Sequence, residues 1–493
     1  MSATEVDDVL KLIGCGYMQV LMVFSCGMTC LYLINEIMGI NFVCGSIAED
    51  FQMNNVQLSL LASSAFLGLI LATHYSGYKS DQIGRRIVML YSLGLGLAAS
   101  LISMLMPSFP VFLLFRFLTG LMLSGGSCVF LTYITECTQI TFRPHIVTFM
   151  SYFFALGWIY VPGVAYLFQP LNRIVFSWGT FDICRWRISL LVNAIPGFVA
   201  FGTMFILPET PKFLLSKRKD ERAFAVLNRL CIINHRKDLK SFGVTSVWQD
   251  NVQEDQSPPR CCLIQMWLDT KPLFKPPYVR PFLHVTAVVC CLFFVGNGLV
   301  TWFSKLRSDL TNEKETMCGD FSCEPRNNTS GADDKSKSNV YMDGIILGVT
   351  ALSTFIFTSI LLVWVKRSLI LFINSTIAFL CGFSLNFWTN QHAILIALVV
   401  FLSPMACSIS LAGSALCDVM PTHMRANAVS LALTFGRLAV IIASGILGFF
   451  FCMQCYVVFN IFVLFAAGKF VRGSILVSNN IVNEPRYSQI SIK

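Results

Sequence analysis

Long apolar runs separated by short polar segments constrain this chain more than any other feature of its sequence. A helix needs about 20 apolar residues to cross a bilayer, and twelve runs are long enough to do so. Because lipid offers no partner to a free backbone group, such runs must be helical inside a membrane. We therefore predict an all-α integral membrane protein. The predicted spans are 17–44, 56–76, 86–106, 109–132, 146–168, 187–207, 281–303, 341–365, 368–389, 393–417, 427–449 and 453–471.

The composition also points to a chain that uses lipid as its solvent. Hydrophobic residues make up 55% and charged residues 13% of the 493 positions, whereas soluble globular chains carry about 25% charged residues. Most of the 19 cysteines lie inside apolar runs, where cysteine usually behaves as a small buried hydrophobe. We find no metal-ligand spacing, no nucleophile beside a base and no P-loop. We therefore predict neither an enzyme nor an ATP-driven pump, and no metal or cofactor.

The charges between the spans predict the topology. The first residues, MSATEVDDVLK, are acidic and do not resemble a signal peptide, so we place the N-terminus in the cytosol. Lys and Arg then gather mostly on the cytosolic side, as the positive-inside rule expects. The predicted order is a cytosolic N-terminus 1–16, a six-helix half 17–207, a cytosolic linker 208–280, a second six-helix half 281–471 that contains an extracellular or luminal loop 304–340, and a cytosolic tail 472–493. Within the linker, residues 211–233 have the pattern of a short amphipathic helical pair.

The predicted outer loop carries two further signals. The sequence Asn-Asn-Thr-Ser provides overlapping glycosylation sites at Asn327 and Asn328, which agrees with a non-cytosolic location. Cys318 and Cys323 lie close together in the same loop. They form a candidate disulfide, and two free thiols are the equally supported alternative.

The polar stretch GYKSDQIGRR, residues 77–86, separates the second span from the third. It places one acid, Asp81, four residues before a pair of arginines in what we predict to be a tight turn. A second pattern occurs once in each half, where an acid and an arginine stand seven residues apart after the fourth and the tenth span. This repetition fits two parallel six-helix repeats. The pairs are Glu136 with Arg143 and Asp418 with Arg425.

These motifs resemble those of a known family. GYKSDQIGRR resembles the signature loop of the major facilitator superfamily, and RFLTG (116–120) and PETPKF (208–213) resemble its sugar-porter and organic-ion branches. CRWRISLLVNAIPG, GNGLVTWF and DVMPTHMRA look like the synaptic vesicle glycoprotein 2 family. The resemblance implies a twelve-helix fold in two six-helix halves. It also implies a secondary active transporter, which is a protein that moves a small solute by alternating access.

The same resemblance implies a network of charges that holds the cytosolic gate shut and breaks on each transport cycle. A glycine would allow two helices to approach closely, and Asp81 would meet Arg85 and a helix N-terminus. The alternative is a solvated turn whose arginines only fix the topology. The residues assigned to the network are Gly77, Asp81, Gly84, Arg85, Arg86, Glu136, Arg143, Glu209, Asp418 and Arg425. Two departures stand out, since Gln82 replaces a usual basic residue and the matching loop 363–368 lacks its Asp and Gly.

Three ionisable residues fall inside predicted spans: Glu36, Arg116 and Arg437. Each costs at least about 2.5 kcal/mol at the bilayer centre, and such residues usually face a cavity and a partner. At 1.5 Å per residue, Glu36 and Arg116 both lie about 10 Å below the outer surface. In sugar porters, which the sequence resembles, an acid and an arginine at these places form the proton-coupling pair. The alternative is a static ion pair, or a Glu36 at the interface.

We find no acid in the sequence at the depth of Arg437. A guanidinium there favours an anionic ligand, as in the organic-anion carriers of the superfamily, and a structural bond to backbone carbonyls is the alternative. Candidate aromatic residues of the cavity are Phe154, Trp158, Tyr160 and Trp302.

We therefore predict a transporter of a small organic solute, with an organic anion favoured and protons as the candidate coupling ion. The alternative is a non-transporting vesicle or receptor-like protein that retains the fold. The expected partners are the substrate and the lipid bilayer, with no nucleic acid and no indicated oligomer. The expected location is the plasma membrane or a secretory or synaptic vesicle membrane.

Overall fold

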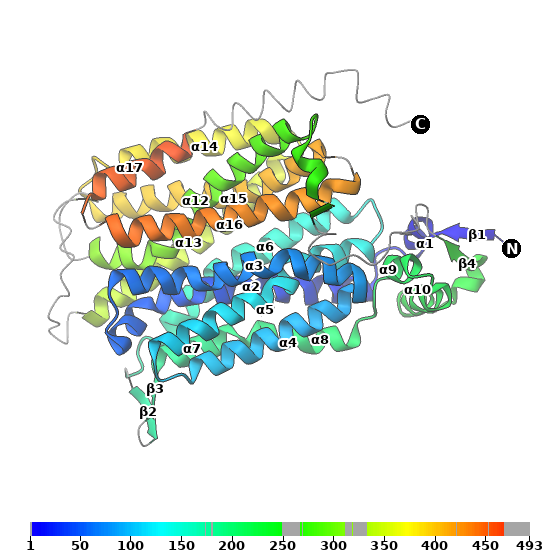
Figure 1. Ribbon diagram of the computed structural model, residues 1–493, viewed down its shortest axis with the longest axis horizontal. Coiled ribbons are helices and arrows are strands. Elements are labelled where there is room, and N and C mark those ends of the chain that lie inside the picture. Colours follow the sequence, from blue (N-terminus) through cyan, green and yellow to red (C-terminus); the bar gives the residue numbers. More distant parts are fainter. Residues whose placement is uncertain are drawn as a thin grey trace. The chain divides into compact units, whose positions relative to one another are not determined.

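The computed structural model describes residues 2–172, 174–178, 181–248, 267–268, 270–310, 318, 333–420, 422–451 and 453–467. Its main elements are long helices (Figure 1). Eleven of the helical segments in the described residues are long and apolar enough to cross a membrane, and together with a shorter apolar helix they match the predicted spans. The membrane helices are α2 (Tyr17–Phe51), α3 (Asn55–Ile83), α4 (Arg85–Met104), α5 (Phe109–Glu136), α6 (Arg143–Phe168), α7 (Arg185–Asn193), α8 (Ile195–Ile206), α12 (Val279–Leu310), α13 (Asp333–Leu361), α14 (Arg367–Ser384), α15 (Gln391–Val419), α16 (Thr422–Phe450) and α17 (Cys455–Ala466).

The sixth predicted span consists of two helices rather than one. Helix α7 ends at Asn193 and α8 begins at Ile195, with a proline, Pro196, in the first turn of α8. Proline suits that position because its missing N–H would have no partner in the first turn of a helix. The break also brings Gly197 against the ring of Tyr32 on α2.

The N-terminus and the linker form elements of their own. These are β1 (Ser2–Glu5), α1 (Val6–Ile13), α9 (Pro211–Ser216), α10 (Asp220–His235), η1 (Leu239–Phe242), β4 (Val244–Trp248) and η2 (Lys271–Phe274), while β2 (Ile174–Trp178) and β3 (Phe181–Cys184) lie between α6 and α7. Strand β1 pairs in parallel with β4, and β2 pairs antiparallel with β3. Helices α9 and α10 correspond to the predicted amphipathic pair.

Helix α1 was not expected, although its sequence carries the signal. Val6, Val9, Leu10 and Ile13 follow the spacing of one helix face, and all four are buried. They belong to one hydrophobic cluster with apolar residues of α10 such as Leu227. The blue α1 and β1 lie beside the green α9, α10 and β4 in Figure 1. The N-terminal segment therefore packs against the linker elements α10 and β4.

The described contacts divide the chain into two compact units. Unit 1 comprises Met1–Glu36, Gly68–Gly157 and Leu191–Gln265, and unit 2 comprises Ile37–Leu67, Trp158–Leu190 and Met266–Lys493. The boundaries pass through α2, α3, α6 and α7, so these helices contribute residues to both units. Each unit is described by itself below.

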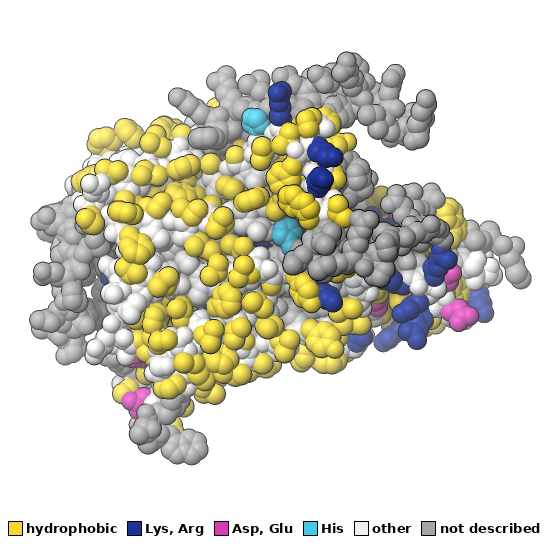
Figure 2. All heavy atoms as spheres, in the orientation of Figure 1, with side chains coloured by type: hydrophobic (Ala, Val, Ile, Leu, Met, Phe, Trp, Pro, Cys, Tyr) yellow, Lys and Arg dark blue, Asp and Glu magenta, His cyan; other side chains and the backbone are white. Residues whose placement is uncertain are grey.

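The surface separates apolar from charged residues in the way that a membrane protein requires. Figure 2 shows yellow apolar side chains spread over the long helices, and dark blue and magenta charges near α9 and α10. Large side chains such as Leu71, Tyr91 and Leu95 are exposed on α3 and α4. The exposed charges at the start of α10 and just before it are Lys217, Arg218, Lys219, Asp220, Glu221 and Arg222. Apolar helix surfaces of this extent need lipid around them.

One disulfide differs from the sequence expectation. Cys318 is bonded to Cys455 at the start of α17, with a Cα–Cα distance of 5.6 Å, which lies in the usual range. The predicted pairing of Cys318 with Cys323 is therefore wrong. Spacing along the chain cannot reveal a partner 137 residues away, and the apolar surroundings of Cys455 conceal its role. Cys323 itself lies outside the described residues, as do the predicted glycosylation sites Asn327 and Asn328.

Candidate functional site

The predicted loop 77–86 is almost entirely helical. Helix α3 continues to Ile83 and α4 starts at Arg85, so Gly84 alone makes the turn. Gly84 has φ +115°, a conformation that favours glycine, and a Cβ there would run into the Glu209 carboxylate. A side chain at Gly77 would meet no atom within 4 Å among the described residues. The predicted close helix approach at Gly77 is therefore not found within unit 1.

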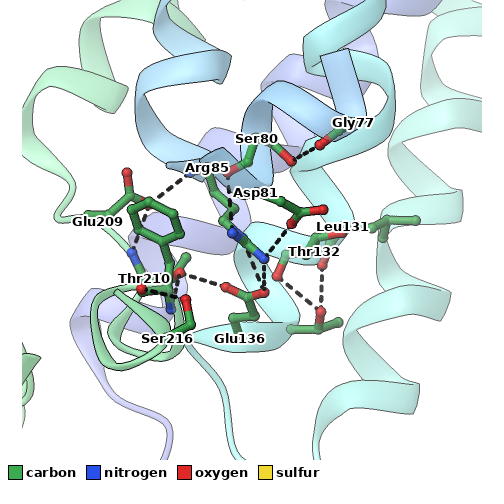
Figure 3. Close-up of polar contacts among 12 residues, drawn as sticks. Gly77, Ser80, Asp81, Arg85, Leu131, Thr132, Glu136, Glu209, Thr210 and Ser216 are labelled. Carbon is green, nitrogen blue, oxygen red and sulfur yellow. Dashed lines mark hydrogen bonds and ion pairs between the residues drawn. The ribbon is translucent and has the colours of Figure 1, made fainter. Parts of the chain in front are cut away.

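Arg85 of α4 is the centre of a network in unit 1 with residues of α3, α5 and α9 (Figure 3). Its Nη2 lies 2.9 Å from Asp81 Oδ1 and 3.1 Å from Glu136 Oε1, and its Nη1 donates to the Ser80 carbonyl oxygen. The guanidinium also lies 5.2 Å from the ring centroid of Phe213. Asp81 is 66% exposed at its side chain, whereas Glu136 is 16% exposed. The contact with Asp81 is therefore the easier one to break.

Glu209 caps α4. Its Oε1 accepts the backbone N–H groups of Arg85, Arg86 and Thr210 at 3.0, 3.1 and 3.0 Å. The first N–H groups of a helix lack partners inside the helix and favour a negative charge. Thr210 extends the link, since its hydroxyl donates to Glu136 Oε2 at 2.6 Å and caps α9. The PETPKF segment thus holds the start of α4 and the end of α5 together.

Two arginines of the predicted network have other partners. The side chain of Arg86 donates to the carbonyl oxygens of Met204 and Phe205, and so satisfies carbonyl groups at the end of α8. Arg143 donates to the carbonyl oxygens of Thr135 and Thr138 and pairs with an N-terminal carboxylate described next. The recorded side-chain contacts of both arginines therefore go to helix-end carbonyl oxygens and to that carboxylate rather than to Glu136, and their role in a gate stays a prediction.

Asp7 of α1 is a functional candidate that the sequence did not reveal. Its Oδ1 lies 2.8 Å from both Arg143 Nη2 and Lys212 Nζ, and its Oδ2 accepts from Lys212 at 2.9 Å. Burial alone would raise the pKa of Asp7, but the Lys212 ammonium and the Arg143 guanidinium outweigh it and hold that pKa below its usual value. Asp7 therefore stays charged at neutral pH and ties α1 to α6 and α9.

The matching positions of the second half are described less fully. Asp418 lies in the last turn of α15 and Arg425 in the first turn of α16. Their side chains are outside the described part of the chain. A gate role for these two residues stays a prediction.

Glu36 and Arg116 form a buried ion pair in unit 1, as their equal depth led us to expect. Arg116 Nη1 lies 2.9 Å from Glu36 Oε2, and the two residues are 1% and 4% exposed. Such a pair needs further hydrogen bonds to offset the desolvation of both charges. Helix α4 provides them.

Two serines one turn apart on α4 lie between the acid and the arginine. Ser100 Oγ donates to Glu36 Oε1 at 2.8 Å, while the Ser100 carbonyl oxygen accepts from Arg116 Nη2 at 3.1 Å. Ser103 Oγ accepts from Arg116 Nε at 2.9 Å and also from Nη2. Arg116 is therefore held by α4 independently of Glu36. The sequence signal for these partners was a pair of serines spaced i, i+3 inside an apolar run.

The candidate cavity residues differ in their surroundings. Trp302 is buried, and its Nε1 donates to Ser444 at 3.2 Å, which joins α12 to α16. It also lines a small cavity in unit 2 with Asn41, Thr301 and Lys305. Trp158 is buried, and Tyr160 is half-buried. Phe154 is half-buried as well.

Arg437 is half-buried on α16 and interacts with another group in the structure. The expectation of an unpaired arginine is therefore wrong. The sequence argument looked only for an acidic residue at the same membrane depth as Arg437. A guanidinium also binds neutral oxygen atoms and aromatic rings.

Unit 2 contains a second buried ion pair that the sequence reasoning missed. Arg307 near the end of α12 bonds Asp343 near the start of α13, with Nε and Nη2 lying 2.7 and 2.6 Å from Oδ2. The two residues are 5% and 7% exposed. Arg307 falls in the segment that we predicted to be an outer loop, because the apolar run ends before the helix does.

The fold and these contacts can be compared with known proteins. The sequence profile of the Major Facilitator Superfamily matches residues 24–444. The chain belongs to the major facilitator superfamily. It is thus a multi-pass membrane protein with the transporter fold of that superfamily.

Among curated proteins, the chain is 25% identical to synaptic vesicle glycoprotein 2A of Rattus norvegicus over 320 residues. It is 23% identical to synaptic vesicle glycoprotein 2B of Homo sapiens over 320 residues. The aligned parts cover 61% of this chain but 43% and 47% of those relatives. The match therefore spans less than half of their length.

Solved structures give the same fold. A partially occluded inward-open structure of the xylose transporter XylE from E. coli matches with a TM-score of 0.67 and 17% identity, covering 95% of this chain and all of that one. A D-xylose-proton symporter matches with a TM-score of 0.65 and 15% identity, covering 92% and 96%. At this identity the similarity concerns the fold.

Proposed function

We propose that the chain is a secondary active transporter that moves a small organic solute by alternating access, with protons as the coupling ion. The observation that carries this proposal is the buried Glu36–Arg116 pair. Arg116 also donates to Ser103 Oγ and to the Ser100 carbonyl oxygen, so we expect protonation of Glu36 to remove one contact of Arg116 and to leave its contacts with α4 in place. A carboxyl group with that freedom is suited to bind and release a proton. Two structural neighbours are named as proton symporters, which supports the same choice.

The network around Arg85 is the proposed gate. Asp81, Glu136, Glu209 and Thr210 bring the end of α3, the start of α4, the end of α5 and the segment before α9 to one guanidinium and one helix N-terminus. Opening requires this end of unit 1 to change its contacts. The exposed Asp81 contact is the one we expect to break first, because a solvated pair contributes about 0–1 kcal/mol.

The test uses the purified chain in proteoliposomes, with and without a pH gradient. The probes are radiolabelled D-xylose and small sets of organic anions and organic cations, because the substrate class is open. We expect a probe to accumulate when the outside is acidic and to stop accumulating when a protonophore is added. Uptake that is the same with and without the pH gradient would contradict proton coupling. Failure of every probe to enter would favour the non-transporting alternative.

The charge of the solute is the finer part of the proposal. We propose a solute with an anionic group that pairs with Arg437, since a half-buried arginine in the α16 span usually faces the bundle interior or a water-filled cavity. A guanidinium binds carboxylate or phosphate through two parallel N–H groups, whereas an ammonium cannot. Arg437→Lys should therefore weaken uptake and Arg437→Ala nearly abolish it. A neutral or cationic solute that Arg437→Ala still transports would overturn this part.

A non-transporting protein that retains the fold is the second candidate. The observation that favours it is the segment between α13 and α14, which lacks the Asp and Gly of the first-half motif and exposes 83% of Trp364. We rank it second because Arg85, Glu136 and Glu209 form a complete network in unit 1, and the buried Glu36–Arg116 pair is also retained.

A further inference from the structure

Tyr32 lies one helical turn before Glu36 on α2 and belongs to the same buried cluster. Residues four apart share a helix face, and Tyr32 is 0% exposed. Its ring is held by α8, because a Cβ at Gly197 would lie 2.7 Å from the ring. The break between α7 and α8 therefore fixes where the phenol can point.

The hydroxyl group of Tyr32 lies beside the Glu36 carboxylate, Ser100 and the Arg116 guanidinium. It nevertheless makes no hydrogen bond of normal distance and angle to any residue that the structure describes. A buried polar group without a partner costs about 1–3 kcal/mol. A hydroxyl left without a bond next to an acid suggests that a different protonation state of the acid uses it.

The donors and acceptors around Glu36 indicate which state that is. In the charged form, Glu36 Oε1 accepts from Ser100 and Oε2 accepts from Arg116. A protonated carboxyl group gains an O–H that needs an acceptor, and arginine has none. Ser100 Oγ already takes an N–H of Arg116 at 3.3 Å. The hydroxyl of Tyr32 can accept as well as donate.

We propose that Tyr32 accepts the hydrogen bond of the protonated Glu36 carboxyl group, and so acts as a positioning residue for the proton-loaded state. This inference rests on the proposed proton-coupled function. The groups recorded around Glu36 in the described residues are the charged Arg116 from α5, Ser100 from α4, and Tyr32 from α2 itself. Asn35, which precedes Glu36 in the chain, donates to the carbonyl oxygen of Asn193 at the end of α7, and this contact involves no titratable group.

The experiment needs no substrate. Infrared difference spectra of the purified protein in liposomes, recorded during a pH titration, follow the carbonyl stretch of protonated carboxyl groups. The band of Glu36 is the one that Glu36→Gln removes. Tyr32→Phe keeps the ring against Gly197 and deletes only the hydroxyl. Ser100→Ala is the matched control, because Ser100 donates to the charged form of Glu36.

The two variants should move the midpoint of the Glu36 band in opposite directions. Loss of a bond to the neutral form lowers the pKa, so Tyr32→Phe should lower the midpoint by roughly one pH unit, a tenfold loss of proton affinity. It should also raise the carbonyl frequency, since the acid loses its acceptor. Ser100→Ala should raise the midpoint.

An unchanged or raised midpoint in Tyr32→Phe would overturn the role of Tyr32 while leaving proton binding by Glu36 intact. A shift in the same direction in both variants would show general loosening of the cluster and would also overturn it. If the wild-type protein gave no band that Glu36→Gln removes, Glu36 would not load a proton. The proposed coupling would then fail together with this inference.

Discussion

The two buried ion pairs have similar charges and similar burial but different surroundings. In unit 1, Arg116 binds Glu36 with one nitrogen and Ser100 and Ser103 with the others. In unit 2, Arg307 directs both of its recorded bonds to one oxygen of Asp343. Its Nη1 is buried and makes no hydrogen bond to the described residues.

The difference separates a pair that can open from a pair that must stay closed. An arginine with independent partners tolerates a neutral acid, whereas an arginine that depends on one carboxylate does not. A buried charge whose partner is removed costs about 3–5 kcal/mol. We therefore infer that the Arg307–Asp343 pair fastens α12 to α13, while Arg116 is also held by partners on α4 besides Glu36.

The largest effect should follow from Asp343→Leu. The substitution leaves buried Arg307 without the one acidic partner recorded for it in the described residues, so unfolding should become easier by about 3–5 kcal/mol. Thermal unfolding of the purified protein in detergent measures this change. Adding Arg307→Met should recover most of the loss, because two apolar side chains can replace a buried pair. A single variant as stable as the wild type would remove the contrast between the two pairs.

Glu36→Gln should cost less, about 1–2 kcal/mol, because Arg116 keeps its serine partners and the amide oxygen can still accept. The variant should lose the pH dependence of net uptake. It should keep solute exchange across the membrane, which needs no net proton movement. Uptake measured as a function of pH tests the loss of coupling, and thermal unfolding in detergent measures the change in stability. Net uptake that keeps its pH dependence would mark Glu36 as a static partner.

Asp81→Asn should separate stability from transport. Its contact with Arg85 is largely solvated, so the free energy of unfolding should change by less than about 1 kcal/mol. Transport should be nearly abolished, because the amide cannot replace the charge of the proposed gate. Uptake by proteoliposomes, at matched protein content, tests this. Normal uptake would refute the gate.

The smallest expected effect is the pH dependence of the attachment of α1, which Asp7 ties to Arg143 and Lys212. The pKa of Asp7 is lowered in the folded protein, so its stabilising contribution is present above the unfolded value of about 3.9 and is lost as the pH falls through the folded pKa. Attachment of α1 should therefore not vary between about pH 5 and 8. Hydrogen exchange of residues 6–13 measures it, and Asp7→Asn should speed exchange equally across that range. A pH-dependent change near neutrality would assign the attachment to another group.

The sequence predicted what depends on distance along a helix. Apolar run length located the spans, and rise per residue placed Glu36 and Arg116 at one depth. It did not predict contacts that depend on rotation about a helix axis, such as those of Ser100 and Tyr32. Contacts between distant segments were also missed, as with Asp7 and Lys212, which are 205 residues apart. Arg307 was missed for another reason, because its helix continues beyond the apolar run that marks the span.

The pairing of β1 with β4 has a consequence for biosynthesis. Ser2 pairs with Val244, so the first strand has no partner until about 240 further residues are made, which takes roughly 10–50 s at 5–20 residues per second. During that time the apolar face of α1, with Val6, Val9 and Leu10, lacks α10 and β4 to cover it. The pairing of β1 with β4 therefore forms after the first six spans have been synthesised, and a ribosome that stalls before Val244 leaves the apolar face of α1 uncovered.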